Sequence, residues 1–542
     1  MTRRLVPRAV VAAGAALTLL AMAVPAMANS PAAGLKWGTC ADADAAAAGW
    51  QCATFKAPKD YGNPGAGWFK IAVTRLPAKD QAHRTGALFI NYGGPGGDAV
   101  ATTQAIGTEL FGPVNDHFDL VAFDPRGVGQ STPAIDCAVN QETQGLYSKP
   151  FITPENLDVK ALIAKDKAYI KRCVSLNKRV LPYVSTANVA RDMDGIRAAM
   201  GDRKLNYFGF SYGTFLGATY ASLFPDNYRA MVLDGPVDAN SYINTPSADL
   251  REQSAGFERA IGRFFAACTG LQSLCNFGPV DPLHGYDAQA SFDALVDRAN
   301  ASPIPVPDGR AAVTGDDLIA ALSYSMYAKQ LWPILAQALS AANAGDGTGV
   351  RDLADAFWGN NEDGTFDPIG DRYFTITAIE QKYDDEVQTF LDAGDNAWGV
   401  FNYTYWNTGY PELNYALWPI HAKDAFYGPF KASTSAPTVL EIATTYDPAT
   451  PYRGAKRLAA ELGNVRFLTM VGDGHTAYLN GSPDCIDTAV VAQIETLTLP
   501  PAGTVCQQNI PFAPPAPPAA TTSALKAGGS ASQLVLRFRA MR

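Results

Sequence analysis

A serine between two glycines, placed where an apolar strand meets a helix, constrains this chain more than any other feature. Residues 205–217 read LNYFGFSYGTFLG, with Ser211 between Gly209 and Gly213. The apolar residues before the serine predict a short buried strand, and those after it predict a helix that ends at Pro225. On such a turn the serine stands above a sheet edge, and glycines are needed because the two backbones pass closely. The pattern predicts a nucleophilic serine, with an ordinary Gly/Ser turn as the alternative.

A glycine-rich loop follows an earlier predicted strand. Residues 87–91 (ALFIN) are apolar and lead directly into residues 92–97, which read YGGPGG. Bare backbone at the C-terminal end of a strand can approach a ligand closely. We expect the backbone N–H groups of Gly94 and Tyr212 to form an oxyanion hole, since Tyr212 starts the helix after the serine. A plain Gly/Pro turn is the alternative.

Strands and helices alternate from about residue 86 to 236. Further buried strands are predicted at 118–123 and 228–233, with helices between them. This alternation is typical of a doubly wound, mostly parallel α/β sheet. An earlier strand, over residues 68–76, is expected at an edge of the sheet.

The loop after the strand at 118–123 carries an acid and a base. Residues 124–131 read DPRGVGQS, so Asp124 and Arg126 lie close together in the sequence. A catalytic pair is one interpretation. We favour a structural ion pair that fixes the loop.

The alternation of predicted strands and helices stops near residue 240 and resumes near residue 431, which divides the chain into segments. We expect a first core segment at 29–239, a helical cap at 240–430 over the active edge of the sheet, and a second core segment at 431–507. Residues 508–542 form a Pro/Ala-rich tail that we expect to be disordered. The second half of the cap is rich in aromatic residues, a few of which are candidates for lining a substrate pocket: Trp398, Phe401, Tyr403, Tyr405, Trp406, Tyr410, Tyr415, Trp418, Phe426 and Tyr427.

One histidine is placed to act as the base for Ser211. The chain has five histidines: His83, His117, His284, His421 and His475. Only His475 lies in a glycine-flanked loop directly after a predicted core strand, at 465–471. A catalytic carboxylate is expected at the end of the preceding strand, where Asp447 stands, because the acid precedes the histidine in this architecture. Asp234 also ends a strand and is the rival acid, whereas Asp473 is too close in sequence to reach the far ring nitrogen.

The N-terminus predicts a secretory signal peptide. Arg3, Arg4 and Arg8 precede an apolar run over residues 9–24, and an Ala-Met-Ala triplet predicts cleavage after Ala28. A membrane anchor is the alternative, although the run is short for a spanning helix. Removal of residues 1–28 takes away three arginines and no acid, so the formal charge moves from −9 to −12. The signal peptide predicts a secreted protein, and an acidic charge without a basic cluster predicts that it binds neither nucleic acid nor membranes. We also expect a monomer.

The cysteines indicate disulfides rather than a metal site. Their number is even, they fall into four sequence-local pairs, and the chain contains no C-x-x-C and no Cys/His cluster. In a secreted chain we expect the pairs to be oxidised, and we expect no metal and no cofactor. The expected pairs are Cys40–Cys52, Cys137–Cys173, Cys268–Cys275 and Cys485–Cys506.

Several of these motifs together resemble one family of enzymes. The motifs are GFSYG at 209–213, YGGPGG at 92–97, DPRGVGQS at 124–131, DPATP at 447–451 and GDGH at 472–475. Their combination resembles the α/β-hydrolase serine peptidases of the proline iminopeptidase and tripeptidyl aminopeptidase type, above all the secreted actinobacterial tripeptidyl aminopeptidases. The resemblance implies an α/β-hydrolase fold and removal of tripeptides from N-termini by Ser211, Asp447 and His475. Proline iminopeptidases are similar but carry a histidine where this chain has Tyr92.

An aminopeptidase must hold the ammonium group of its substrate, because a desolvated ammonium is costly unless it is paired. The cap offers six acids for this purpose: Glu362, Asp363, Glu380, Asp384, Asp385 and Glu386. Two other functions stay open, namely a secreted carboxylesterase of the same fold and a non-catalytic binding module.

Overall fold

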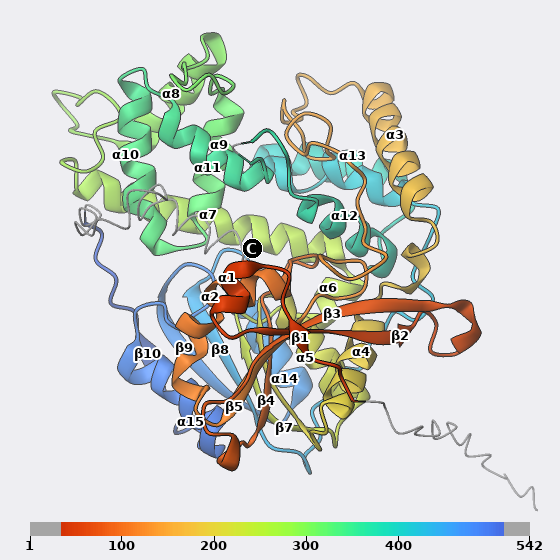
Figure 1. Cartoon of the computed structure of the whole chain (residues 1–542). Coiled ribbons are helices and arrows are strands. Elements are labelled where there is room, and N and C mark those ends of the chain that lie inside the picture. The colour runs from red at the N-terminus through yellow and green to blue at the C-terminus, as the bar shows by residue number, and fades with distance from the viewer. Residues whose placement is uncertain (1–33, 362, 514–542) are drawn as a thin grey trace, which may run out of the picture. The chain divides into compact units, whose positions relative to one another are not determined.

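The computed structural model describes residues 34–361 and 363–513. The expected signal peptide and most of the expected tail lie outside the described residues. Within them, ten strands form a single sheet in the order β1-β2-β3-β5-β4-β6-β7-β8-β9-β10 (Figure 1). The strands are β1 (Gly38–Thr39), β2 (Gln51–Pro58), β3 (Trp68–Leu76), β4 (Gly86–Asn91), β5 (Phe118–Phe123), β6 (Leu205–Phe210), β7 (Tyr228–Asp234), β8 (Val439–Tyr446), β9 (Val465–Asp473) and β10 (Val505–Gln507).

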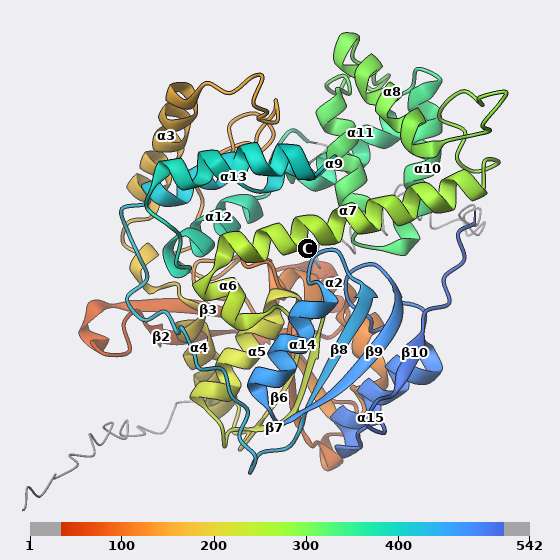
Figure 2. The same cartoon turned by 180° about the vertical axis from the view of Figure 1, so that it is seen from behind.

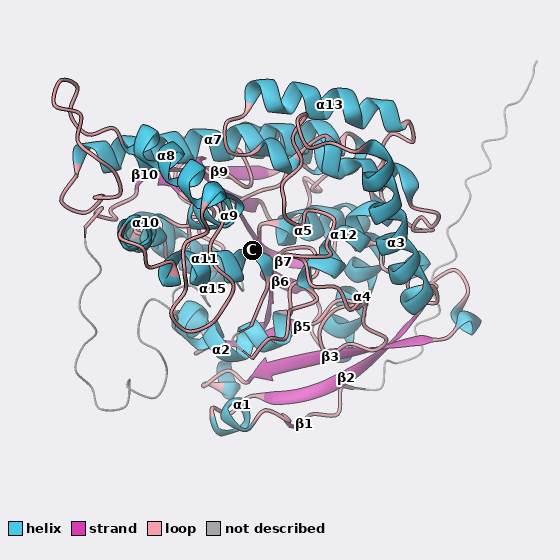
Figure 3. Cartoon of the chain, turned by 90° about the horizontal axis from the view of Figure 1, so that it is seen from above, coloured by secondary structure: helices cyan, strands magenta, loops and turns pink. Residues whose placement is uncertain are grey.

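The sheet is parallel from β5 to β10 and antiparallel from β1 to β5. Every residue of β4, β5 and β6 is buried, as expected for parallel strands with helices on both faces. The expected position of β3 is wrong, because this strand pairs with both β2 and β5 and so lies inside the sheet. Two further antiparallel strands, β1 and β2, extend the sheet beyond it (Figure 3).

Helices cover both faces of the sheet, so the predicted doubly wound architecture is confirmed. The α-helices are α1 (Ala43–Ala47), α2 (Ala99–Phe111), α3 (Val159–Asn177), α4 (Thr186–Ala199), α5 (Tyr212–Leu223), α6 (Ala239–Asn244), α7 (Pro246–Gly270), α8 (Ala288–Ala301), α9 (Gly315–Ser325), α10 (Trp332–Asn343), α11 (Thr348–Trp358), α12 (Ile369–Glu380), α13 (Val387–Val400), α14 (Tyr452–Leu462) and α15 (Thr488–Thr496). Leu110 of α2 and Ile494 of α15 are buried on one face, while Met193 of α4, Leu216 of α5 and Leu458 of α14 are buried on the other (Figures 1 and 2).

The chain between β7 and β8 is helical and has its own apolar core. Phe264 of α7, Trp332 and Leu335 of α10 and Val350 of α11 are buried together in that core. Figures 1 and 2 show α7 between the sheet and the other helices of this cap. The cap also contains the 3₁₀ segments η6 (Tyr405–Asn407) and η7 (Tyr410–Leu417).

A second segment, between β5 and α4, packs against the cap. Phe151 is part of the apolar core of the cap. Asp371 of α12 accepts hydrogen bonds from the backbone N of Cys137 at 2.9 Å, from Gln141 at 2.7 Å and from the hydroxyl of Tyr169 at 2.8 Å. The helical layer above the sheet is therefore built from two parts of the chain, namely the cap between β7 and β8 and the segment before α4 that packs against it.

Disulfides join all four cysteine pairs that the sequence predicted. The pair Cys137–Cys173 closes a loop of 36 residues at the base of the segment before α4. Among the described residues, no helix combines the length and apolar character needed to cross a membrane.

Candidate active site

Ser211 lies on the turn between β6 and α5 in a backbone conformation that residues other than glycine rarely adopt. Its φ and ψ angles are 55° and −126°. A Cβ atom at Gly209 would lie 2.4 Å from the carbonyl oxygen of Gly213, and one at Gly213 would lie 2.8 Å from that of Asn91. Both flanking glycines are therefore required by close backbone contacts, and the turn holds Ser211 partly exposed at the carboxyl edge of the sheet.

The glycine loop after β4 lies directly against this turn. A Cβ atom at Gly93 would be 2.9 Å from the Cβ of Ser211. The backbone N–H of Gly93 donates to Asn91 Oδ1 at 3.1 Å. Gly94 and Pro95 line the same pocket as Ser211 and Tyr212. Since proline has no N–H, Gly94 is the one of the two that can donate to a ligand, as can Tyr212 at the first position of α5.

Asp447 and His475 are in direct contact. The Nδ1 atom of His475 lies 2.9 Å from Asp447 Oδ2 and 3.0 Å from Oδ1. The backbone N–H groups of Ala449 and Thr450 donate to Asp447 Oδ1 at 2.9 and 2.8 Å, and the Thr450 hydroxyl donates to Oδ2 at 3.0 Å. The carboxylate is thus fixed by a turn that starts where β8 ends, and the Thr450 hydroxyl also lies 3.2 Å from Nδ1 of His475.

The other nitrogen of His475 is free to take a proton. Nε2 is buried and has no hydrogen-bond partner within residues 34–361 and 363–513. The cap fixes the loop that carries this histidine, because the carbonyl oxygen of Tyr327 accepts the backbone N–H of His475 at 2.7 Å. The Tyr327 ring also packs edge-on against the imidazole, with the ring centroids 5.7 Å apart.

Ser211 and His475 flank the same peptide unit. The backbone N–H of Ser211 donates to the carbonyl oxygen of Asp234 at 3.0 Å. A Cβ atom at the next residue, Gly235, would lie 3.0 Å from Cε1 of the His475 ring. The serine turn and the histidine therefore both lie at the end of β7, where Gly235 leaves room for the imidazole, and no hydrogen bond joins Nε2 of His475 to Ser211 in the described residues.

The carboxylates of Asp234 and Asp473, which also lie near His475 in the fold or in the sequence, bind other groups. The carboxylate of Asp234 accepts the backbone N–H groups of Ala477 at 2.9 Å and Tyr478 at 2.8 Å, so it fixes the chain after His475. Burial raises the pKa of Asp234 to about 7. Asp473 pairs with Arg263 and with Lys329, both from the cap.

The remaining histidines and the Asp124–Arg126 loop are away from Ser211. Side chains of the first three histidines face Asp80, Glu495 and Asp281, and His421 lines a separate surface cavity. The expected ion pair in the loop is not formed. Arg126 pairs with Asp192, whereas Asp124 accepts the backbone N–H groups of Val100 and Gln130. Both side chains still fix the loop, each through another partner.

The pocket above Ser211 is rich in aromatic side chains from the cap, from the serine turn and from the segment before α4. Of the aromatic residues in the second half of the cap that the sequence singled out, Trp406 lines this pocket. The other aromatic lining residues come from several elements of the fold: Tyr147, Tyr212, Tyr242, Phe257, Tyr327, Phe357, Trp358, Tyr373, Phe374 and Tyr383. Their positions depend on how the helices pack, which no local pattern in the sequence reports.

None of the described cap acids expected to hold an ammonium group lines this pocket. Asp363 and Glu386 are exposed, Asp384 and Asp385 line the separate cavity, and Glu380 is buried against α4. Glu362 lies outside the described residues.

Three other acids do line the pocket, beside a single arginine. Asp238 and Glu252 both pair with Arg457, and Asp249 lies near them on the first turn of α7. Burial, together with the charges of Asp238 and Glu252, raises the pKa of Asp249 to about 8. The sequence does contain a signal for two of these acids. Asp249 and Glu252 are three residues apart on α7, so they lie on the same face of that helix.

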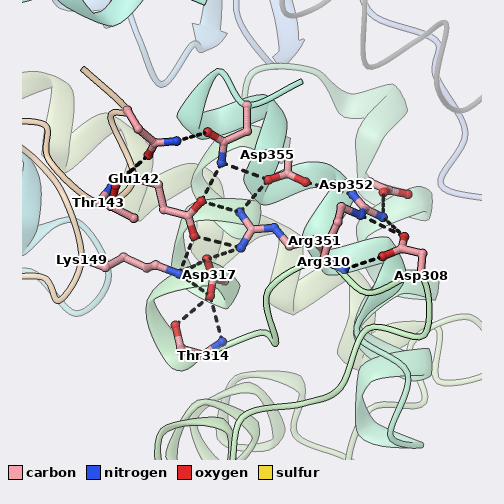
Figure 4. A network of polar contacts seen from close by, with 12 residues as sticks. Glu142, Thr143, Lys149, Asp308, Arg310, Thr314, Asp317, Arg351, Asp352 and Asp355 are labelled. Atoms are coloured by element: carbon pink, nitrogen blue, oxygen red, sulfur yellow. Dashed lines mark hydrogen bonds and ion pairs between the residues drawn. The ribbon is translucent and has the colours of Figure 1, made fainter. Parts of the chain in front are cut away.

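A buried ion-pair network holds the two sides of the pocket wall together (Figure 4). Arg351 of α11 contacts Glu142 at 3.0 Å, Asp317 of α9 at 3.1 Å and Asp355 at 2.8 Å. Lys149 joins Glu142 and Asp317 from the segment before α4. That segment carries Gln141 and Tyr147 into the pocket, and α9 and α11 carry Ser323, Phe357 and Trp358.

No side-chain cluster suited to a metal ion occurs near Ser211 in the described part of the chain. The only candidate group there is Cys137, Cys173 and Asp371. Its two sulfur atoms form a disulfide, and its carboxylate already accepts three hydrogen bonds.

Comparisons with known proteins show similarity to α/β hydrolases. The family model of the α/β hydrolase fold matches residues 86–276, and a model described as TAP-like protein matches residues 405–506. These ranges include the serine turn, Asp447 and His475.

Three curated relatives cover most of the chain. Serine protease Hip1 of Mycobacterium tuberculosis is 33% identical over 463 residues, which are 84% of this chain and 87% of Hip1. Carboxylesterase B of the same species is 32% identical over 464 residues, or 84% of this chain and 86% of the relative. Tripeptidyl aminopeptidase of Streptomyces coelicolor is 29% identical over 455 residues, or 82% of this chain and 80% of the relative.

Proposed function

This chain belongs to the α/β-hydrolase family that includes serine protease Hip1 and the TAP-like proteins, and from that membership we propose that it is a secreted serine exopeptidase that releases tripeptides from free N-termini. The chain is a serine hydrolase of the α/β fold. The exopeptidase activity, the catalytic triad and secretion are the proposed parts.

In this proposal Ser211 is the nucleophile and His475 is the general base. His475 takes the hydroxyl proton of Ser211 on Nε2 while Asp447 accepts from Nδ1 and stabilises the imidazolium. The backbone N–H groups of Gly94 and Tyr212 hold the oxyanion of the tetrahedral intermediate. His475 then protonates the leaving amine, and water hydrolyses the acyl-enzyme by the same steps.

The observation that carries the exopeptidase assignment is the group of three carboxylates in the pocket of Ser211. Asp238, Asp249 and Glu252 face one arginine there, Arg457. An ammonium group in a desolvated pocket needs a carboxylate partner, whereas a neutral ester needs none. We assign Asp249 as the main partner of the substrate N-terminus, because the other two acids already pair with Arg457.

A carboxylesterase is the second candidate function. The aromatic walls of the pocket suit an apolar acyl group, and a relative at 32% identity is named Carboxylesterase B. The same triad serves esters and amides, so the substrate decides between the two. A proline iminopeptidase, which releases a single proline, is a further alternative.

Turnover of chromogenic substrates separates these candidates. The mature enzyme is assayed on a tripeptide p-nitroanilide with a free N-terminus, on its N-acetylated form, on proline p-nitroanilide and on a short-acyl p-nitrophenyl ester, with Ser211→Ala as the blank. The proposal predicts cleavage of the free tripeptide anilide and little cleavage of the acetylated one. Strong ester turnover without anilide cleavage would establish an esterase, and preference for the proline anilide would establish an iminopeptidase.

Secretion is supported by the N-terminal sequence and by four disulfides, since disulfides persist in oxidising compartments. We propose cleavage after Ala28 and substrates that are N-termini of peptides or proteins. Edman sequencing of the protein recovered from the culture medium tests the cleavage site. An intact Met1 in cell-bound protein would contradict it.

A further inference from the structure

A buried carboxyl group of the cap reaches the residue that follows the nucleophile. Glu380 ends α12 and is only 2% exposed. Its Oε2 accepts both the backbone N–H of Thr186 at 3.0 Å and the Thr186 hydroxyl at 2.9 Å. The same hydroxyl oxygen lies 2.5 Å from the hydroxyl of Tyr212. When Glu380 is ionised, the Thr186 hydroxyl donates to the carboxylate, and the phenol of Tyr212 then donates to Thr186.

We propose that Glu380 is a positioning residue for the oxyanion hole, acting through Thr186 on Tyr212. The inference rests on the proposed role of the Tyr212 backbone N–H. Tyr212 is the first residue of α5 and follows Ser211, whose φ is 55°. A donor must lie within about 2.7–3.1 Å of the developing oxyanion to stabilise it. Anchoring the far end of the Tyr212 side chain therefore limits rotation of the peptide unit that carries this donor.

The surroundings of Glu380 indicate a function beyond stability. Burial raises its pKa to about 7, and the groups that face it include the phenols of Tyr212, Tyr242 and Tyr427. Oε1 has no hydrogen-bond partner among the described residues. A carboxyl group in such a place costs stability, and groups of this kind concentrate at functional sites.

The contacts among Glu380, Thr186 and Tyr212 also join the cap to the core at the serine turn. Glu380 belongs to the cap helix α12, Thr186 begins the core helix α4, and Tyr212 begins α5. Gln381, the next residue after Glu380, lines the substrate pocket. The geometry therefore couples the position of the cap above the pocket to the direction of the oxyanion donor.

Four conservative variants test the proposal: Glu380→Gln, Thr186→Val, Tyr212→Phe and the double variant Thr186→Val/Tyr212→Phe. Thr219→Val is the matched control, because Thr219 is equally buried, lies on α5 and has a hydroxyl without a partner in the described structure. The readouts are kcat and KM on a p-nitrophenyl ester and on a tripeptide anilide, per active site titrated with a fluorophosphonate. The ester is included because every serine hydrolase with this site uses the oxyanion hole.

We expect Thr186→Val and Tyr212→Phe each to lower kcat about tenfold on both substrates, with KM within twofold, since complete loss of one oxyanion donor costs about 10²–10³ in kcat. The double variant should be no slower than the slower single variant, because both break one chain of contacts. Glu380→Gln should retain most activity, because its amide oxygen can accept the same two bonds, and Thr219→Val should match the wild type.

Two results would overturn the proposal. If Thr186→Val and Tyr212→Phe unfold at a lower temperature than the wild type but keep its kcat per titrated site, the contact is merely structural. A rise in KM at constant kcat would show a substrate contact instead. A wild-type enzyme that cleaves esters but not peptides refutes the exopeptidase proposal alone, because the ester series still tests Glu380, whereas absence of any Ser211-dependent turnover refutes both.

Discussion

Asp447 Oδ2 lies 2.9 Å from Nδ1 of His475, at the point where two neighbouring parallel strands end. Asp447 follows β8, and His475 comes two residues after β9. The turn formed by Ala449 and Thr450 fixes the carboxylate, so the imidazole is oriented by a group that cannot swing away. This relationship determines which ring nitrogen faces the serine turn.

Replacing Asp447 with asparagine should therefore abolish most turnover. The amide cannot stabilise the imidazolium, and we expect kcat to fall about 10³–10⁴-fold with little change in KM. Asp234→Asn is the matched control. It should cost about 1–3 kcal/mol of stability, because a buried carboxylate that accepts two backbone N–H groups is altered, but less than tenfold in kcat. Equal losses of kcat in the two variants would assign the acid role to Asp234.

The strained backbone at Ser211 predicts that a glycine at this position makes the folded state more stable than an alanine does. Its φ of 55° with ψ of −126° is a conformation that glycine adopts freely. We expect both variants to be inactive and Ser211→Gly to unfold at a higher urea concentration than Ser211→Ala. The expected difference in the free energy of unfolding is about 1 kcal/mol. Urea unfolding followed by fluorescence measures the difference, and equal stability of the two variants would contradict strain at this turn.

Asp249 should decide how the enzyme recognises a free N-terminus. We expect Asp249→Asn to raise KM for a free tripeptide anilide about tenfold or more without changing kcat, and to leave the acetylated substrate unaffected. The exposed cap acid Asp363 supplies the control variant Asp363→Asn, which should behave as the wild type.

The pH dependence of KM should follow from the same carboxyl group. Burial and the neighbouring carboxylates raise the pKa of Asp249 to about 8, so its negative charge develops as the pH rises through that value. The α-amino group of the substrate loses its own charge at a pH of about 8. KM should therefore fall between pH 6 and 8 in the wild type and rise above it, and the fall should be absent in Asp249→Asn. A variant with the wild-type profile would remove Asp249 from the recognition site.

Glu441 should make the folded state less stable as the pH rises. It lies within β8, fully buried, and neither carboxylate oxygen has a hydrogen-bond partner in residues 34–361 and 363–513. Burial raises its pKa well above the ordinary value of 4.5. The folded state thus keeps a proton that the unfolded chain releases, so its contribution to stability is complete below about pH 4.5 and is lost as the pH rises above it.

Substitution of Glu441 isolates this contribution. We expect Glu441→Gln to lose less stability than the wild type between pH 5 and 7.5, and Glu441→Met to be more stable than the wild type at pH 7.5 by about 1–3 kcal/mol. The exposed Glu386→Gln controls for the change in net charge. Urea unfolding at both pH values measures the slopes, and parallel slopes for Glu441→Gln and the wild type would disprove the assignment.

The features found from the sequence are those that local patterns encode. Strands β4 to β9 are apolar runs, and the motifs with Ser211, Asp447 and His475 each follow one of them, so the shared carboxyl edge follows from a parallel sheet. The four disulfides were also predictable, because each pair is close in sequence.

The features missed depend on packing between distant segments. Asp238, Asp249 and Arg457 come from the chain after β7, from α7 and from α14, and no spacing links them. The segment between β5 and α4 contributes Tyr169 and Cys173 to the main apolar core, and its additional contacts with the cap, through Asp371 and the network around Arg351, are not encoded by any local pattern (Figure 4). The charge of Glu380 is visible in the sequence, whereas its burial against Thr186 depends on the fold.

Mass spectrometry of a digested peptide mixture shows whether the enzyme removes tripeptides from free N-termini. Matched peptides with free and acetylated N-termini are incubated with the mature enzyme, with Ser211→Ala as the control. We expect tripeptides and the corresponding shortened products from the free peptides, and no products from the acetylated ones. Cleavage of acetylated peptides at the same rate, or cuts at internal positions, would contradict this expectation.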